Sequence, residues 1–185
     1  MRHKLLALSL VAWILVLAPQ LRADQAADDQ AFFDKQTAKF VKLQPTRLTD
    51  PAVEKVFKAV MYKVNVVSSD GSSTTAVVAR TGDDITIVSI PSSTAEMPDL
   101  VKLLNPEFTL KSASDGKTFQ DALDAIYPID TTFNKDDVKA KATRHKGNQW
   151  TFIRGKFFDH FKGFIVTTDA AGHVTAVKWT LDDIK

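Results

Sequence analysis

The residues best suited to acid–base chemistry are the three histidines that follow residue 23, namely His145, His160 and His173. Of these, His160 directly follows a carboxylate, Asp159, and a carboxylate can orient an imidazole for proton transfer. Adjacent residues of a strand point to opposite faces, however, so this spacing does not by itself bring the two groups together. The other two histidines border predicted turns, where we expect them to be solvated.

Sequence motifs for metal and nucleotide binding are absent. There is no His-x-x-x-His pair, no His-Glu-x-x-His helix and no cysteine, so a zinc site would need residues from distant parts of the chain. No Gly-x-Ser-x-Gly motif and no glycine-rich phosphate loop occurs. We therefore expect no metal and no cofactor. Adjacent aspartates lack the spacing of a calcium loop and more simply begin helices or form turns; examples are Asp28-Asp29, Asp83-Asp84 and Asp136-Asp137.

The C-terminal third interleaves basic and aromatic side chains, a combination that can bind anionic polymers or stack on sugar and base rings. Trp150, Phe152 and Arg154 share one face of a predicted strand. If that face is core, Arg154 must be paired or lie at a sheet edge, because an unpaired buried guanidinium is costly. If it lines a groove, the rings form a stacking floor and Arg154 a charged hook for an anion. We select Trp150, Arg154 and His160 as candidate ligand-binding residues.

Two kinds of periodicity alternate along the chain and predict an α+β fold. Apolar residues three or four apart indicate helices, and strict alternation between turn residues indicates strands. Strands that follow one another through short turns form hairpins and meanders, so we expect an antiparallel sheet with about four helices packed mainly on one face. The predicted helices are 24–42, 50–60, 98–104 and 115–127; the predicted strands are 62–66, 74–80, 85–90, 138–144, 149–154, 163–168 and 173–181, with 108–111 as a further short strand and 156–161 compatible with either pattern.

Capping and turn residues mark several of these boundaries. Asp50 can cap a helix that begins with proline, and Asp115 or Thr118 can cap the last predicted helix. The segment Asp169–Gly172 is the turn of the clearest hairpin. We expect Gly172 to take a positive φ at the end of this turn.

Residues 1–23 have the pattern of a cleavable secretory signal peptide. Arg2 and Lys4 precede an apolar run from Leu5 to Ala18, which is shorter than the roughly 20 residues needed to span a bilayer. Ala23 provides a small residue at the cleavage position. We therefore expect export to the periplasm or the exterior of a bacterium, with no transmembrane anchor after cleavage.

The remaining residues, 24–185, are ordinary in length for one domain and contain no cysteine. We expect a single domain with an N-terminal helical segment over 24–47 and the main sheet-containing body over 48–185. The first 23 residues hold three basic and no acidic residues, so the net charge of +2 for the whole chain becomes −1 without them. Such a balance does not favour nucleic-acid binding, and stability must come from packing without disulfides.

These features favour an exported, non-enzymatic binding or accessory module of the cell envelope, whose partner is a protein or a small molecule. One alternative is an envelope hydrolase or isomerase with scattered acid and base residues, for which Asp159, His160 and Arg154 are the first candidates. A second alternative is an anion or polysaccharide binder that uses the basic and aromatic C-terminal third. A concave pocket with perturbed titratable groups would favour the enzyme, and a flat apolar patch a protein partner.

Overall fold

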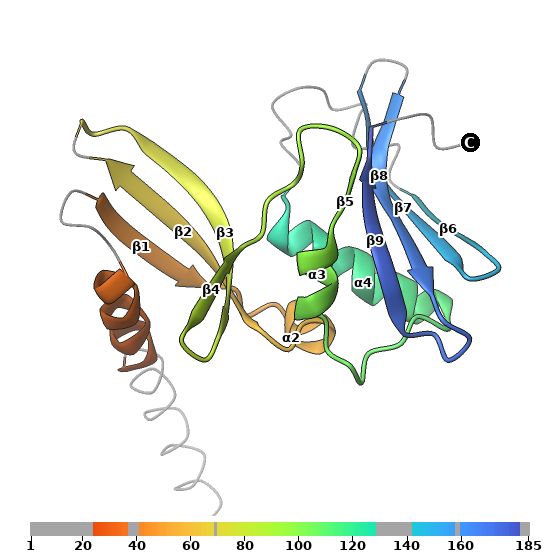
Figure 1. Ribbon diagram of the computed structural model, residues 1–185, viewed down its shortest axis with the longest axis horizontal. Coiled ribbons are helices and arrows are strands. Elements are labelled where there is room, and N and C mark those ends of the chain that lie inside the picture. Colours follow the sequence, from red (N-terminus) through yellow and green to blue (C-terminus); the bar gives the residue numbers. More distant parts are fainter. Residues whose placement is uncertain (1–23, 37–40, 69, 129–141, 158–159, 182–185) are drawn as a thin grey trace, which may run out of the picture. The chain divides into compact units, whose positions relative to one another are not determined.

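The structure is a computed structural model that describes residues 24–36, 41–68, 70–128, 142–157 and 160–181 (Figure 1). These residues form an α+β fold with antiparallel strands, as the sequence predicts. The strands divide between two sheets, one in the order β1-β2-β3-β4 and one in the order β5-β9-β8-β7-β6. The strands are β1 (Val41–Arg47), β2 (Val60–Ser68), β3 (Ser73–Thr81), β4 (Asp84–Ile87), β5 (Ala95–Glu96), β6 (Ala142–Lys146), β7 (Gln149–Phe157), β8 (His160–Thr168) and β9 (Val174–Thr180); the helices are 24–36, α2 (Pro51–Val56), α3 (Pro98–Leu103) and α4 (Ala113–Ile126).

The predicted signal peptide, residues 1–23, lies outside the described residues. Within the described parts of the chain, no helix combines the length and the apolar character needed to cross a membrane.

One compact unit consists of the described residues between Asp24 and Arg47 together with those between Val64 and Thr75. Residues 24–36 are helical and bury Phe33, which confirms the beginning of the predicted N-terminal helix. The side-chain amide of Gln30 donates to the backbone carbonyl of Leu43 at 2.9 Å, which ties this helix to β1.

The expected helical segment over 24–47 is wrong in its last part, because Val41–Arg47 form β1. From Lys42 to Arg47 the side chains alternate between exposed and half-buried positions, the period of a strand with one covered face. Pro45 is compatible with this strand because β1 is an edge of its sheet, where one side of the backbone needs no ladder partner.

The meander of β2, β3 and β4 confirms the three consecutive strands predicted from the sequence. Asp50 caps α2 as predicted, its Oδ1 accepting from the backbone N–H of Ala52 at 2.8 Å. This helix ends at Val56, earlier than expected, and Val60 already belongs to β2.

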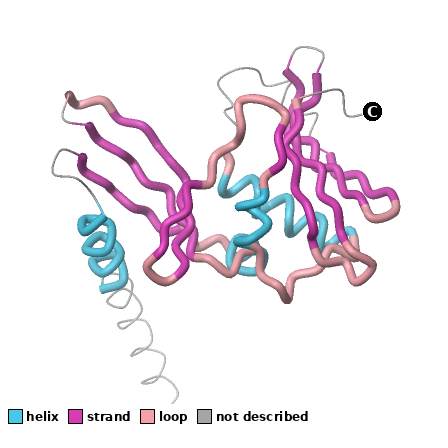
Figure 2. Tube along the Cα trace, in the orientation of Figure 1, coloured by secondary structure: helices cyan, strands magenta, loops and turns pink. Residues whose placement is uncertain are grey.

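The second compact unit, Leu48–Lys63 with the chain from Ala76 onward, contains the main hydrophobic core. Helices α2, α3 and α4 lie on one side of the five-stranded sheet, as Figure 2 shows, which agrees with the predicted arrangement. The predicted apolar face of α4 is fully buried; it consists of Phe119, Ala122, Leu123 and Ile126. Its phenylalanine ring lies 5.2 Å from that of Phe152 on β7, between ring centroids.

Helix α4 begins one residue after Ser112, which is its N-cap in place of the predicted Asp115 or Thr118. Asp115 is instead the third helical residue of a capping box. The Ser112 hydroxyl accepts from the Asp115 N–H at 3.2 Å, and the Asp115 carboxylate accepts from the Ser112 N–H at 3.0 Å. The predicted short strand over 108–111 has no regular structure, although the Leu110 N–H donates to the carbonyl of Gly172 at 2.8 Å.

The last third of the chain forms consecutive hairpins, as predicted. Strand β6 consists of residues 142–146, which include the last three residues of the predicted strand over 138–144. Residues 138–141 lie outside the described part of the chain. Residues 156–157 and 160–161, which fit either pattern in the sequence, extend β7 and β8. Gly172 has a φ of 86°, which confirms the positive φ expected at this turn.

Candidate functional site

Trp150 is 3% exposed and is covered from two elements. Helix α4 approaches it so closely that a Cβ added at Gly116 would lie 2.6 Å from the indole Cζ3. The His145 imidazole stacks on the indole with ring centroids 4.0 Å apart and an interplanar angle of 13°. Phe152, on the same face of β7, is fully buried. The core alternative is therefore confirmed for Phe152, and Trp150 does not present an open stacking surface.

Arg154 is 3% exposed and is held inside the fold by two acceptors. Its Nε donates to Oδ1 of Asp124 on α4 at 3.1 Å, and its Nη2 donates to the backbone carbonyl of Tyr127, the C-cap residue of α4. Its guanidinium carbon lies 5.7 Å from the ring centroid of Phe164. Burial lowers the pKa of Arg154, and the charge of Asp124 opposes this shift. The guanidinium is thus paired, as the core alternative requires. It also places a positive charge at the C-terminal end of α4, where the helix dipole favours a cation.

His160 lies at the end of the β7–β8 hairpin away from Trp150. It pairs in register with Phe157, whereas Trp150 pairs with Val166. Asp159 lies outside the described residues. The structure therefore does not group the three sequence-selected residues at one surface, and a ligand-binding role for them stays a prediction.

The carboxylate–imidazole pair that the described residues do form is Asp169 with His173, at a hairpin turn. The Oδ2 of Asp169 lies 3.1 Å from Nδ1 of His173, and its Oδ1 accepts from the His173 backbone N–H at 2.8 Å. The backbone hydrogen bond is the main cause that holds the pKa of Asp169 below its usual value. Both side chains are exposed, so the main role of the pair is to stabilise the hairpin turn.

The described residues support neither a serine nucleophile activated by a lysine nor a metal site. A Ser-x-x-Lys spacing, Ser114 to Lys117, lies at the exposed start of α4, and Lys117 is paired with Asp121 at 2.5 Å between Nζ and Oδ2. No group of three or more histidine, aspartate or glutamate side chains within these residues is arranged to hold a metal ion.

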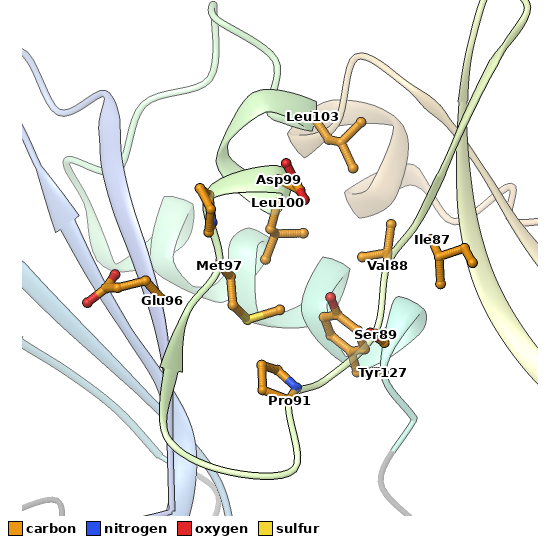
Figure 3. A pocket seen from close by; sticks show the side chains of 11 residues that line it. Ile87, Val88, Ser89, Pro91, Glu96, Met97, Asp99, Leu100, Leu103 and Tyr127 are labelled. Atoms are coloured by element: carbon orange, nitrogen blue, oxygen red, sulfur yellow. The ribbon is translucent and has the colours of Figure 1, made fainter.

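One concave site of the second unit is a pocket of about 160 Å³, which we name the Tyr127 pocket (Figure 3). Its apolar side chains come from the end of β4 and the segment after it, from α3 and its N-cap, and from the C-terminal end of α4, so three stretches of the second unit meet there. Ser89, Glu96 and Asp99 supply its polar groups. The lining residues are Ile87, Val88, Ser89, Pro91, Glu96, Met97, Pro98, Asp99, Leu100, Leu103 and Tyr127.

The hydroxyl of Tyr127 is buried and has no hydrogen-bond partner among the described residues. Tyr127 is 5% exposed, and in Figure 3 its hydroxyl points toward the side of the pocket formed by Leu100 and Val88. Burial raises the pKa of Tyr127, so the hydroxyl stays protonated and available as a donor. Of the four buried side-chain polar atoms without a partner in the described chain, this is the one in the Tyr127 pocket; the others belong to Gln120, Trp150 and Trp179.

Arg154 and Tyr127 are physically connected, although they have different roles. The guanidinium of Arg154 binds the main-chain carbonyl of Tyr127, while the Tyr127 ring stacks on Phe164 with centroids 5.6 Å apart. These two contacts fix the end of α4 and hence the direction of the phenol. Arg154 is therefore a positioning residue for the pocket.

Tyr127 is not among the site residues selected from the sequence, in which it marks only the end of a helix before Pro128. The lining of the pocket is spread over 41 residues of chain, from Ile87 to Tyr127. A tyrosine at a helix terminus has no local pattern that separates a core residue from a ligand contact, so no sequence feature identified it.

Comparison of the chain with protein-family models, with curated proteins and with solved structures gives no match. The function of this chain must therefore be inferred from the chemistry of its site alone.

Proposed function

We propose that residues 24–185 act as an exported, non-enzymatic binding module of the cell envelope, and that the Tyr127 pocket is its ligand site. The observation that supports this proposal is the buried hydroxyl of Tyr127, which has no partner among the described residues. Leaving a buried donor without an acceptor costs about 1–3 kcal/mol, and a ligand acceptor removes that cost.

The size and lining of the pocket define the class of ligand. Its volume of about 160 Å³ is close to the ~150 Å³ of an apolar protein cavity that holds one benzene molecule. Met97, Leu100 and Leu103 supply an apolar wall, and the Tyr127 hydroxyl supplies one donor. The ligand is thus an aromatic ring or a branched aliphatic group with a hydrogen-bond acceptor, such as a carbonyl, next to it.

The polar groups of the pocket support binding over catalysis. A raised pKa at Tyr127 moves its phenol further from proton exchange near neutral pH, unlike the perturbed groups of an enzyme. Asp99 is engaged by Lys102, with 2.8 Å between Oδ1 and Nζ. Within the described residues, no hydrogen bond joins Ser89 to an imidazole or carboxylate that would activate it as a nucleophile.

The export part of the proposal is supported by the basic residues and the apolar run of residues 1–23. It is tested by intact-mass measurement of the protein from fractionated bacteria that express the full chain. We expect a mature protein that begins at Asp24 in the envelope or culture fraction. Full-length protein confined to the cytoplasm would contradict export.

The ligand site is tested with acetophenone and ethylbenzene, which have nearly the same shape but differ in the carbonyl acceptor. Binding is followed by NMR titration of residues 24–185 and of its Tyr127→Phe variant. We expect acetophenone to bind the wild type more tightly, and Tyr127→Phe to weaken acetophenone binding about fivefold, the worth of one hydrogen bond of about 1 kcal/mol.

Ethylbenzene is the matched control, because it cannot accept a hydrogen bond. Its affinity should be the same for the wild type and for Tyr127→Phe. Equal losses for both compounds would show that the hydroxyl is no ligand contact, and no binding of either would remove the pocket as the site.

A further inference from the structure

Among the edges of the two described sheets, that of β4 carries the least protection against pairing with a further strand. β1 contains Pro45, β6 presents exposed Arg144 and Lys146, and β5 is only two residues long. Proline, charge and shortness are the usual devices that keep edge strands from pairing with other chains. β4 has four residues, Asp-Ile-Thr-Ile, without proline or a basic residue, and its last residue, Ile87, is 68% exposed.

At two residues of β4, the backbone N–H and C=O groups point away from the neighbouring strand and are open to a further strand. The N–H of Val88 donates to the carbonyl of Val77 at 2.8 Å, so these two residues form a hydrogen-bonded pair. Bonded and non-bonded pairs alternate along an antiparallel ladder, so Val78 with Ile87 is a non-bonded pair. The same holds two residues earlier, at Ile85. The N–H and C=O groups of Ile85 and Ile87 therefore point away from β3.

The Tyr127 pocket begins where this edge ends. Ile87 and Val88 both belong to its lining, and Figure 3 shows the Val88 side chain on the pocket side and Ile87 directed away from it. An added strand alternates in the same way, so its residue beside Val88 projects toward the pocket. The volume of about 160 Å³ accommodates one apolar side chain.

The charges near the β4 edge indicate which residues should lie on either side of the apolar residue in a bound segment. Asp84 begins β4, and Glu96 belongs to the pocket lining; both side chains are exposed. Basic residues on either side of an apolar residue would complement these carboxylates.

We propose that the β4 edge and the Tyr127 pocket together bind an extended segment of a partner protein. The segment pairs as an added strand with Ile85 and Ile87, inserts one leucine- or phenylalanine-sized side chain into the pocket, and offers a main-chain carbonyl to the Tyr127 hydroxyl. This inference rests on the proposed function, because it uses the same pocket and names its occupant.

The test is an NMR titration of residues 24–185 with the capped peptide Lys-Thr-Val-Leu-Val-Thr-Lys. Variants of the peptide carry phenylalanine, alanine or aspartate at the centre, or glutamate at both ends. We expect amide shifts at Ile85, Ile87 and Tyr127, with leucine or phenylalanine at least tenfold tighter than aspartate. The peptide with glutamate ends should bind more weakly than the lysine form, and the difference should shrink in high salt.

Strand pairing is tested separately from the pocket. Ile85→Pro removes an N–H that points away from β3 and keeps the existing ladder, and Ile85 is not part of the pocket lining. It should therefore weaken peptide binding at least tenfold and leave acetophenone binding unchanged. Ile85→Val keeps the N–H and is the matched control, with peptide affinity within about twofold of wild type. Should Ile85→Pro fail to fold, two N-methylated peptides replace it, one methylated at the leucine and one at both valines. Successive N–H groups of a strand point in opposite directions, so one of the two methylated peptides must lose at least tenfold in affinity.

The outcomes separate this inference from the proposed function. Two results overturn strand addition and retain the pocket as a binding site. The first is acetophenone binding without peptide binding. The second is peptide binding that neither Ile85→Pro nor N-methylation of the peptide weakens. Binding of neither probe overturns both. Sedimentation velocity that shows concentration-dependent dimers abolished by Ile85→Pro would assign the edge to a second copy of the chain and also overturn the inference.

Discussion

Arg154 and Tyr127 are two buried polar residues in contact with each other, and their polar groups are satisfied differently. The guanidinium of Arg154 has a carboxylate and a carbonyl of the fold as acceptors. The hydroxyl of Tyr127 has no acceptor in the described chain and faces a pocket. A buried polar group with internal partners stabilises the fold, whereas one without a partner is available to a ligand. The charged residue of this pair is therefore structural, and the neutral one is the residue on which the proposed ligand site depends.

The largest effect on stability should come from Trp150→Ala, because Trp150, like Arg154, has a structural role. Removal of a buried indole leaves a cavity beneath α4, and we expect the free energy of unfolding to fall by about 3–5 kcal/mol in urea denaturation. Thr151→Ala, at the half-buried neighbouring position of β7, is the control and should cost less than about 1 kcal/mol. A loss at Trp150 as small as that of the control would mean that the indole is a surface group.

Asp124→Ala should have the next largest effect, because it leaves the Arg154 guanidinium buried without its carboxylate. Breaking such a pair from one side costs about 3 kcal/mol, whereas Arg154→Met removes the buried charge itself and should cost less. Asp121→Ala, one turn earlier on α4 in an exposed pair, should change stability by less than about 0.5 kcal/mol. Equal losses at positions 124 and 121 in the same denaturation experiment would contradict the structural role of Arg154.

His145→Ala should have a modest effect, since the imidazole covers Trp150 from an exposed position on β6. We expect a loss of about 0.5–1 kcal/mol, which is the worth of one ring–ring contact. Arg144→Ala, the exposed neighbour, is the control and should be close to neutral. If the thermal midpoint is the same for both variants, the stacked imidazole contributes nothing to the covering of the indole.

Tyr127→Phe should have the smallest effect on stability, and the opposite sign. The variant removes a buried hydroxyl that has no acceptor, so we expect the free energy of unfolding to stay unchanged or to rise by up to about 1 kcal/mol. This result, together with weakened acetophenone binding, would place the hydroxyl in the ligand site. A destabilisation of more than 1 kcal/mol would show that the hydroxyl has a partner in the fold, like Arg154.

Several elements could be predicted because their determinants are local. Asp50 before a proline defines the start of α2, the apolar spacing of Phe119 to Ile126 defines the buried face of α4, and Gly172 defines its hairpin turn. Where the prediction is wrong, a competing pattern decides. Val41–Arg47 continue the glycine-free composition of the preceding helix, and pairing with β2 makes them a strand.

The candidate site was beyond sequence analysis for a different physical reason. The requirement that Arg154 be paired if its face is buried follows from the cost of an isolated charge, and this part was predicted. The identity of its partners, Asp124 and the carbonyl of Tyr127, was not, because they lie about 30 residues earlier on a helix that packs across the sheet.

The sequence by itself therefore determined the α+β class, the hairpins, the caps and the condition that Arg154 must satisfy, all of which depend on spacing or on single-residue energetics. Tertiary structure alone decided that the strands form two sheets, that Trp150 lies beneath α4, and that the Tyr127 hydroxyl is buried without an acceptor in the described chain. These features arise where segments distant in sequence pack together, and the satisfaction of a buried polar group depends on every neighbour at once.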